Sequence, residues 1–175
     1  MKSSISLTSA SGLQKQGINL TLVKNLTYSL ACLAFSVIIG AAIFEHLVIW
    51  PKAYAAPPQS LSMFQGNYGV NPGIFWTMIH PVTLLIFIVN LIWNWKTPRK
   101  SNLLIAFAGY FLILVATGLY FVPELMDILG ADFADRIDSD LVARGSKWQI
   151  LSSIRLVGLI ALAFVLYLGL TKTKD

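Results

Sequence analysis

Residues 26–50 decide the fold: they read LTYSLACLAFSVIIGAAIFEHLVIW, and their one carboxylate is Glu45, near the end. Crossing the hydrocarbon core of a bilayer takes about 20 mostly apolar residues. Three later stretches have the same length and character, at residues 73–95, 102–122 and 148–170. Because lipid offers the backbone no hydrogen-bond partner, each stretch must pair its own peptide groups, and we expect four helices.

Composition agrees with these four stretches. Of the 175 residues, 56% are hydrophobic and 12% are charged, whereas soluble domains carry about 25% charged residues. So few charges cannot cover a globular surface in water. We therefore predict an all-α integral membrane protein, an up-and-down four-helix bundle whose main partner is the lipid bilayer. The net charge of +5 is explained below by orientation, and we expect no nucleic-acid partner.

The chain divides into a short tail and one membrane domain. Its first residues are rich in Ser, Thr and Lys and predict a polar tail on the cytoplasmic side. The predicted units are the tail at 1–24, the transmembrane domain at 25–175, and outer loops at 51–72 and 123–147. In the second loop, Phe133, Ile137 and Leu141 follow helical spacing and predict a short interfacial helix over residues 131–143.

Lysine and arginine predict the orientation, because they are in excess in cytoplasmic segments. Eight such residues fall in the termini and in the short connection at residues 96–101, against four in the outer loops. We therefore expect both termini in the cytoplasm, in a multi-pass protein of the inner (plasma) membrane. The eight are Lys2, Lys15, Lys24, Lys96, Arg99, Lys100, Lys172 and Lys174, and the four are Lys52, Arg136, Arg144 and Lys147.

The ionisable residues of the spans all fall near their outer ends. Such residues are costly in lipid, and they usually face the bundle interior or a polar cavity. Up-and-down topology alone brings them to one level, which predicts a polar site there. Its predicted members are Glu45, His46, His80, Glu124 and Arg155, joined along helical faces by Trp76, Tyr120, Trp148 and Ser152.

Each side chain of this predicted site has a chemical role open to it. We expect His80 or His46 to act as a base, Arg155 to hold an oxyanion or carbonyl, and Tyr120 to complete the catalytic set. The expected substrate contacts are Glu45, Glu124, Trp76, Trp148 and Ser152. A structural alternative is a salt bridge from Arg155 to Glu45 or Glu124, with the histidines as hydrogen-bonded helix contacts.

The same residue types also suit a bound metal or haem. Two histidines and a carboxylate are a ligand set typical of iron, copper or zinc. The predicted metal ligands are His46, His80, Glu45 and Glu124. The two histidines lie on the same side of the membrane, so a haem between two helices is the other cofactor compatible with the sequence.

Several short motifs resemble those of one membrane family. Gly40, Glu45, Trp50 and Pro51 close the first span, and the third ends with Thr117, Tyr120, Phe121, Pro123 and Glu124; the remaining matches are Pro57, Gln65, Phe75, Trp148 and Arg155. The pattern resembles the anthrone-oxygenase-like family of small four-helix membrane proteins. The resemblance implies a membrane four-helix bundle and, as in a few fungal members, oxidation of a polycyclic anthrone to a quinone.

Two functional hypotheses follow. The first is an oxidoreductase acting on a hydrophobic small molecule that enters from the bilayer. The second is a non-enzymatic membrane subunit that binds a lipid, haem, pigment or protein partner, in a homo-oligomer or a larger membrane complex. A transporter is a weaker hypothesis, because the spans contain no mid-membrane charge and no broken-helix pair.

Overall fold

A computed structural model describes the backbone of residues 4–172 and the side chains of residues 20–172. Within these ranges the chain is helical and has no β-strand, which confirms the all-α prediction. Four helical segments are long and apolar enough to cross a membrane: Leu20–Ala53, Gly73–Asn94, Lys100–Leu129 and Ser139–Thr171. The elements are α1 (Ser4–Phe44), η1 (Glu45–Ile49), α2 (Trp50–Ala53), η2 (Gln59–Phe64), α3 (Gly73–Asn94), α4 (Lys100–Ala116), η3 (Thr117–Phe121), α5 (Val122–Leu129), α6 (Ser139–Leu168) and η4 (Gly169–Thr171).

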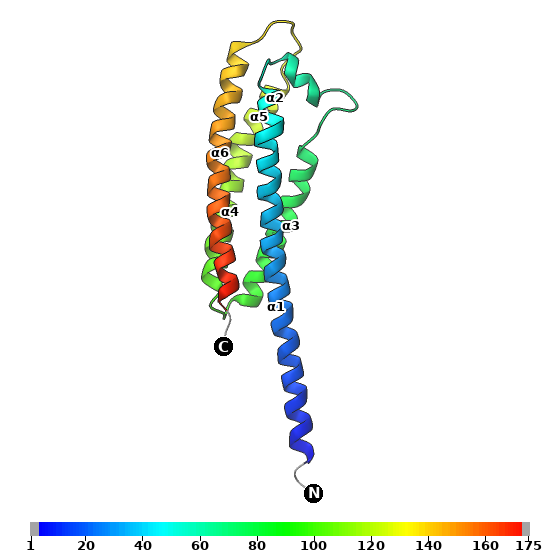
Figure 1. Cartoon of the computed structure of the whole chain (residues 1–175), viewed down its shortest axis with the longest axis vertical. Coiled ribbons are helices and arrows are strands. Elements are labelled where there is room, and N and C mark those ends of the chain that lie inside the picture. Colours follow the sequence, from blue (N-terminus) through cyan, green and yellow to red (C-terminus); the bar gives the residue numbers. More distant parts are fainter. Residues whose placement is uncertain (1–3, 173–175) are drawn as a thin grey trace.

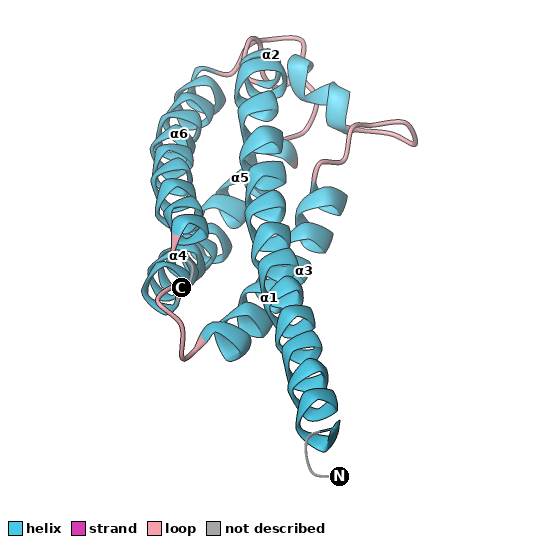
Figure 2. Cartoon of the chain, turned by 60° about the horizontal axis from the view of Figure 1, so that its bottom comes forward, coloured by secondary structure: helices cyan, strands magenta, loops and turns pink. Residues whose placement is uncertain are grey.

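The four long helices form a closed ring. α1 packs against α3 and α6, and α4 also packs against α3 and α6. Figure 2 shows α4 and α6 on one side of the bundle and α1 and α3 on the other. In Figure 1 both termini and the α3–α4 connection lie at one end, and the two longer loops lie at the other. The helices therefore run alternately up and down, with α1 projecting past the bundle on the side of the termini.

Aromatic side chains fill the middle of the bundle. Phe35, Phe87 and Tyr110 are fully buried, and their ring centroids lie 5.2–6.0 Å apart. Such edge-on and tilted pairs add about 0.5–1.5 kcal/mol each beyond the area they bury. We call these three rings the aromatic layer. It fills the bundle interior between the two ends of the molecule.

A second core closes the end opposite the termini. Trp50 is stacked on Tyr54 at 6.0 Å and meets Trp148 edge-on at 4.9 Å between ring centroids. The first loop folds onto these rings, because Leu61 of η2 is fully buried among them. The two loops also join directly, since Asp138 N–H donates to the Pro57 carbonyl at 2.8 Å. Both outer loops are thus ordered parts of the fold.

A polar layer ties the helices together at the end that holds the termini. Arg99 is only 6% exposed. Its Nη1 donates to Asn25 Oδ1 at 2.7 Å, and its Nε donates to the Lys172 carbonyl at 3.2 Å. Lys172 Nζ in turn donates to Asn102 Oδ1 at 2.8 Å. These bonds connect α1, the α3–α4 hairpin and the end of the chain.

Some helix boundaries differ from the predictions. Residues 4–24 are helical and belong to α1. Residues 1–3 and 173–175, with Lys2 and Lys174, lie outside the described residues, as does the Lys15 side chain. The interfacial helix predicted over residues 131–143 is wrong, because residues 131–138 are not helical. Phe133 and Ile137 are both 61% exposed, so neither side chain packs into the rest of the protein. Asp138 instead caps α6, accepting from the Asp140 and Leu141 N–H groups.

Candidate functional site

Two π-helical turns shape the end of the bundle opposite the termini. η1 closes with the Trp50 N–H bonded to the Glu45 carbonyl, and η3 closes with the Val122 N–H bonded to the Thr117 carbonyl. A proline follows each closing residue, at Pro51 and Pro123. Proline lacks the N–H for the next helical bond, and its ring clashes with the carbonyl four residues earlier. The wider π turn relieves that clash, and such turns are frequent at functional sites.

Glu45 lies at the start of η1 and points toward α3. Its Oε1 accepts a hydrogen bond of 2.8 Å from Trp76 Nε1. Trp50 Nε1, in the aromatic core, is buried and has no hydrogen-bond partner. One indole N–H group therefore holds the Glu45 carboxylate, which is half-buried.

His80 is held between two aromatic side chains. Its ring is stacked on Trp76 at 5.3 Å between centroids, and its Nδ1 is hydrogen bonded to the Tyr110 hydroxyl at 2.7 Å. Thr83, one turn further along α3, is fully buried, and its Oγ1 has no hydrogen-bond partner. Since Nδ1 is engaged with Tyr110, Nε2 is the nitrogen of His80 left to face a ligand.

Arg155 projects from α6 into the same level. Nη1 donates to Thr117 Oγ1 and Nη2 donates to Ser152 Oγ, both at 2.8 Å. Its Cζ lies 4.3 Å from the centroid of the Phe121 ring. The guanidinium therefore has two hydroxyl partners and an aromatic face, and it makes no carboxylate contact within 4 Å, because the ion pairs among the described residues belong to Arg144.

The indole of Trp76 connects two members of the predicted site. Its Nε1 donates to the Glu45 carboxylate, and its ring is stacked on the His80 ring. His46 Nδ1 is bonded to the Ala42 carbonyl at 2.7 Å, whereas its Nε2 is buried without a partner. The structure thus brings Glu45 and His80 into contact with one side chain.

Three predicted members lie elsewhere. Glu124 is paired with Arg144 at 2.8 Å, so the predicted alternative of a salt bridge to Arg155 is wrong for this residue. Tyr120 is 37% exposed on the outside of η3 and makes no hydrogen bond to the other members. Trp148 is a core residue: it is 3% exposed, and its Nε1 donates to the Phe121 carbonyl at 2.8 Å.

The predicted metal ligands do not assemble. Among the described residues, no group of three or more His, Cys, Asp or Glu side chains is placed to hold a metal ion. Glu124 is taken by Arg144, and the Nδ1 atoms of His46 and His80 are bonded to Ala42 and Tyr110.

Tyr110 and both π turns were not predicted from the sequence. Tyr110 precedes Thr117 by seven residues, and this spacing puts the two side chains on one face of a helix. The π turns had a weaker signal, a proline near the end of two apolar spans.

Tyr54 follows the first apolar helical segment. Burial raises the pKa of its hydroxyl, with a smaller contribution from the charge of Glu124. Tyr54 therefore remains protonated, and its oxygen has no partner.

Comparison of the chain with protein-family models, with curated proteins and with solved structures found no match in any of the three. The resemblance to the anthrone-oxygenase-like family therefore stays a prediction.

Proposed function

We propose that this protein is integral to the plasma membrane, crosses it four times, and has both termini in the cytoplasm. Four apolar helices of sufficient length support the crossing. Their outward faces carry Leu85, Leu112, Leu119 and Phe164, each at least 62% exposed, as expected for a surface that meets lipid. The lysine and arginine distribution supports the orientation. Single cysteines at Lys96 and Arg136 in a Cys32→Ser background test it, since only the second should react with an impermeant thiol reagent added outside cells.

Within this topology, the function is to bind a hydrophobic small molecule that carries an anionic or carbonyl oxygen. One observation carries the proposal: Arg155 contacts two hydroxyls and no carboxylate, although it lies within an apolar helix. A cation at such a position needs a counter-charge. No carboxylate of the described residues lies within 4 Å of it, which leaves guanidinium donors for a ligand oxygen. Arginine suits this role because its planar fork matches a carboxylate.

Arg155 and Arg144 both lie in α6, so substitutions at the two positions give a matched test. The ligand oxygen should depend on Arg155, whereas Arg144 already has two carboxylate partners. In lipid nanodiscs, Arg155→Gln should abolish saturable binding of a fatty carboxylate such as dodecanoate, and Arg144→Gln should leave it unchanged. Equal binding by the wild type and by Arg155→Gln would refute the proposal.

A second candidate is an enzyme that removes a proton from the bound molecule. The His80–Tyr110 hydrogen bond of 2.7 Å favours it, because Nε2 is a free base in the tautomer whose Nδ1–H donates to the Tyr110 hydroxyl. The oxidoreductase hypothesis on an anthrone-like substrate would use this step, with molecular oxygen as the oxidant. Formation of the quinone by purified protein, lost in His80→Ala and retained in His46→Ala, would support this candidate; turnover that is equal in His80→Ala would count against it.

A further inference from the structure

The end of the bundle that holds the termini carries positive charge without a carboxylate to balance it. Among the residues whose side chains the structure describes, the carboxylates are Glu45 and those between Glu124 and Asp140, all of which lie toward the other end. The cationic side chains of the terminal end are Lys24, Lys96, Arg99, Lys100 and Lys172. We call this end the basic end.

Arg99 is held on three sides at the basic end. Its Nη1 and Nε donate to Asn25 and to the Lys172 carbonyl, and its Cζ lies 5.1 Å from the centroid of the Tyr28 ring. Nη2 makes no hydrogen bond to a described residue, and it does not belong to the enclosed polar atoms that lack a partner. This nitrogen therefore reaches the surface, where it is able to donate to an oxygen from outside the bundle.

Lys172 offers further donors next to Arg99. Its side chain is exposed, and its Nζ donates one hydrogen bond of 2.8 Å to Asn102 Oδ1. An ammonium group has three N–H donors, so two are left for another partner. A guanidinium fork and an ammonium group both suit the oxygens of a phosphate.

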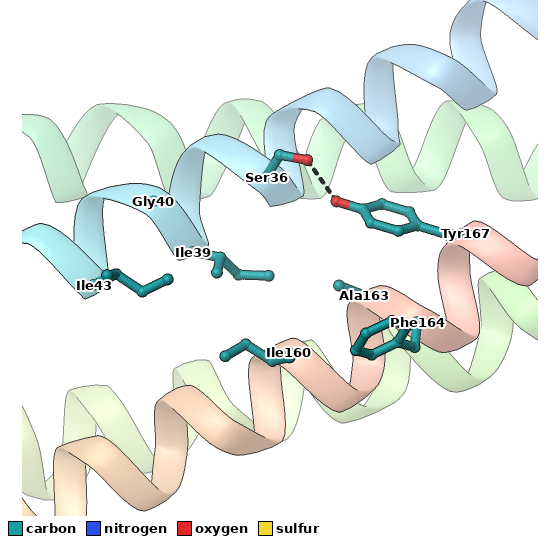
Figure 3. A pocket seen from close by; sticks show the side chains of 8 residues that line it. All are labelled: Ser36, Ile39, Gly40, Ile43, Ile160, Ala163, Phe164 and Tyr167. Carbon is teal, nitrogen blue, oxygen red and sulfur yellow. Dashed lines mark hydrogen bonds between the residues drawn. The ribbon is translucent and has the colours of Figure 1, made fainter.

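The helices that carry these donors are fixed to one another close by. The Tyr28 hydroxyl donates to the Leu166 carbonyl at 2.7 Å, and Asn102 Nδ2 donates to the Val165 carbonyl at 2.6 Å. The hydroxyls of Ser36 and Tyr167 are hydrogen bonded between α1 and α6 (Figure 3). The donors are therefore in place before a ligand arrives, which lowers the cost of binding.

Apolar side chains surround the cations of the basic end. Leu26 is 60% exposed, Trp95 51% and Leu170 39%. Lys100 Nζ lies 3.7 Å from the centroid of the Trp95 ring, and exposed tryptophans of this kind are typical of the level of lipid head groups. A ligand at this end would meet both cations and apolar surface, which are the two chemistries of a phospholipid.

We propose that the basic end binds the phosphate of an anionic phospholipid, with Arg99 Nη2 and Lys172 Nζ as donors and the acyl chains on the surrounding apolar side chains. This inference goes beyond the ligand site at Arg155 and needs only that the chain spans a bilayer. Basic clusters beside transmembrane helices attract anionic lipids, and each basic residue contributes about fivefold to the affinity.

The test is native mass spectrometry of the full chain in detergent, titrated with dioleoyl phosphatidylglycerol or with dioleoyl phosphatidylcholine. The wild type should bind the anionic lipid at least about fivefold more tightly. Arg99→Gln and Lys172→Gln should each weaken phosphatidylglycerol binding by about fivefold and leave phosphatidylcholine binding unchanged. Lys172 is exposed, so its variant leaves the buried Arg99 in place. Arg136→Gln removes the same charge from an exposed position at the other end and should change neither affinity.

Glycerol 3-phosphate separates a lipid from a free phosphate, because it carries the phosphate without acyl chains. As a competitor at the concentration of the lipid, it should leave phosphatidylglycerol bound. Displacement of the lipid would overturn the choice of a phospholipid. Equal affinity of the wild type for the two lipids, or a phosphatidylglycerol affinity unchanged in both Arg99→Gln and Lys172→Gln, would overturn the site itself.

Discussion

Replacing Gly145 by alanine would test the aromatic core that closes the outer end of the bundle. A β-carbon at this position would stand 2.5 Å from Tyr54 Cδ1. The Tyr54 ring has little room to move, because Trp50 stacks on it at 6.0 Å and Trp148 meets it at 6.4 Å between centroids. Overpacking of a core costs about 1–3 kcal/mol, whereas alanine gains about 1 kcal/mol over glycine within a helix. We expect Gly145→Ala to lower the free energy of unfolding by about 1 kcal/mol.

The assay is unfolding by sodium dodecyl sulfate in mixed micelles, followed by tryptophan fluorescence. Gly40→Ala is the control, because its methyl group meets no atom within 4 Å, and it should raise the free energy of unfolding by about 0.5–1 kcal/mol. In a Tyr54→Ala background, Gly145→Ala should no longer destabilise, because the clashing ring is gone. A Gly145→Ala protein as stable as the wild type would refute this account of the outer core.

Four further substitutions probe three contacts by the same unfolding assay. Glu124→Gln and Arg144→Gln should show a coupling energy of about 0.2–1 kcal/mol in a double-mutant cycle, because the paired side chains are 27% and 29% exposed; a coupling near zero would indicate that the pair does not form. Tyr110→Phe should cost about 1–3 kcal/mol, since it leaves His80 Nδ1 without its partner, and a neutral result would contradict that bond. Arg99→Leu should cost at least about 1–3 kcal/mol, because it strips Asn25 and the Lys172 carbonyl of a buried donor, whereas unchanged stability would show that the polar layer contributes nothing.

The helices were predictable because hydropathy alone sets them. Each predicted span lies largely within one of the long apolar helical segments. The ends were less predictable: α5 continues to Leu129, and α6 begins at Ser139, nine residues before Trp148. The third helical segment therefore carries Glu124 past the level of Arg155 and into reach of Arg144. Sequence alone could not assign this depth, because the apolar residues of a span define its centre better than its ends.

The site was predictable as a neighbourhood and less so as a set of contacts. Glu45 and His80 meet at Trp76, because up-and-down topology brings the matching ends of neighbouring spans together. Tyr120 did not join them, because its predicted place on a helical face of the site assumed α-helical spacing. The π turn η3 inserts one residue into that frame and turns Tyr120 outward. A pattern search based on 3.6 residues per turn cannot detect such an insertion.

The aromatic layer has a consequence for pharmacology. Phe35, Phe87 and Tyr110 are fully buried and fill the interior between His80 and the end that holds the termini, so a molecule that arrives from that end has no route to the imidazole through the bundle. In the proposed orientation that end faces the cytosol, and compounds would reach this residue from the external medium or sideways through the bilayer. A blocking compound would then act on intact cells without entering them, and drug-efflux pumps that clear the cytosol would give the cell no protection.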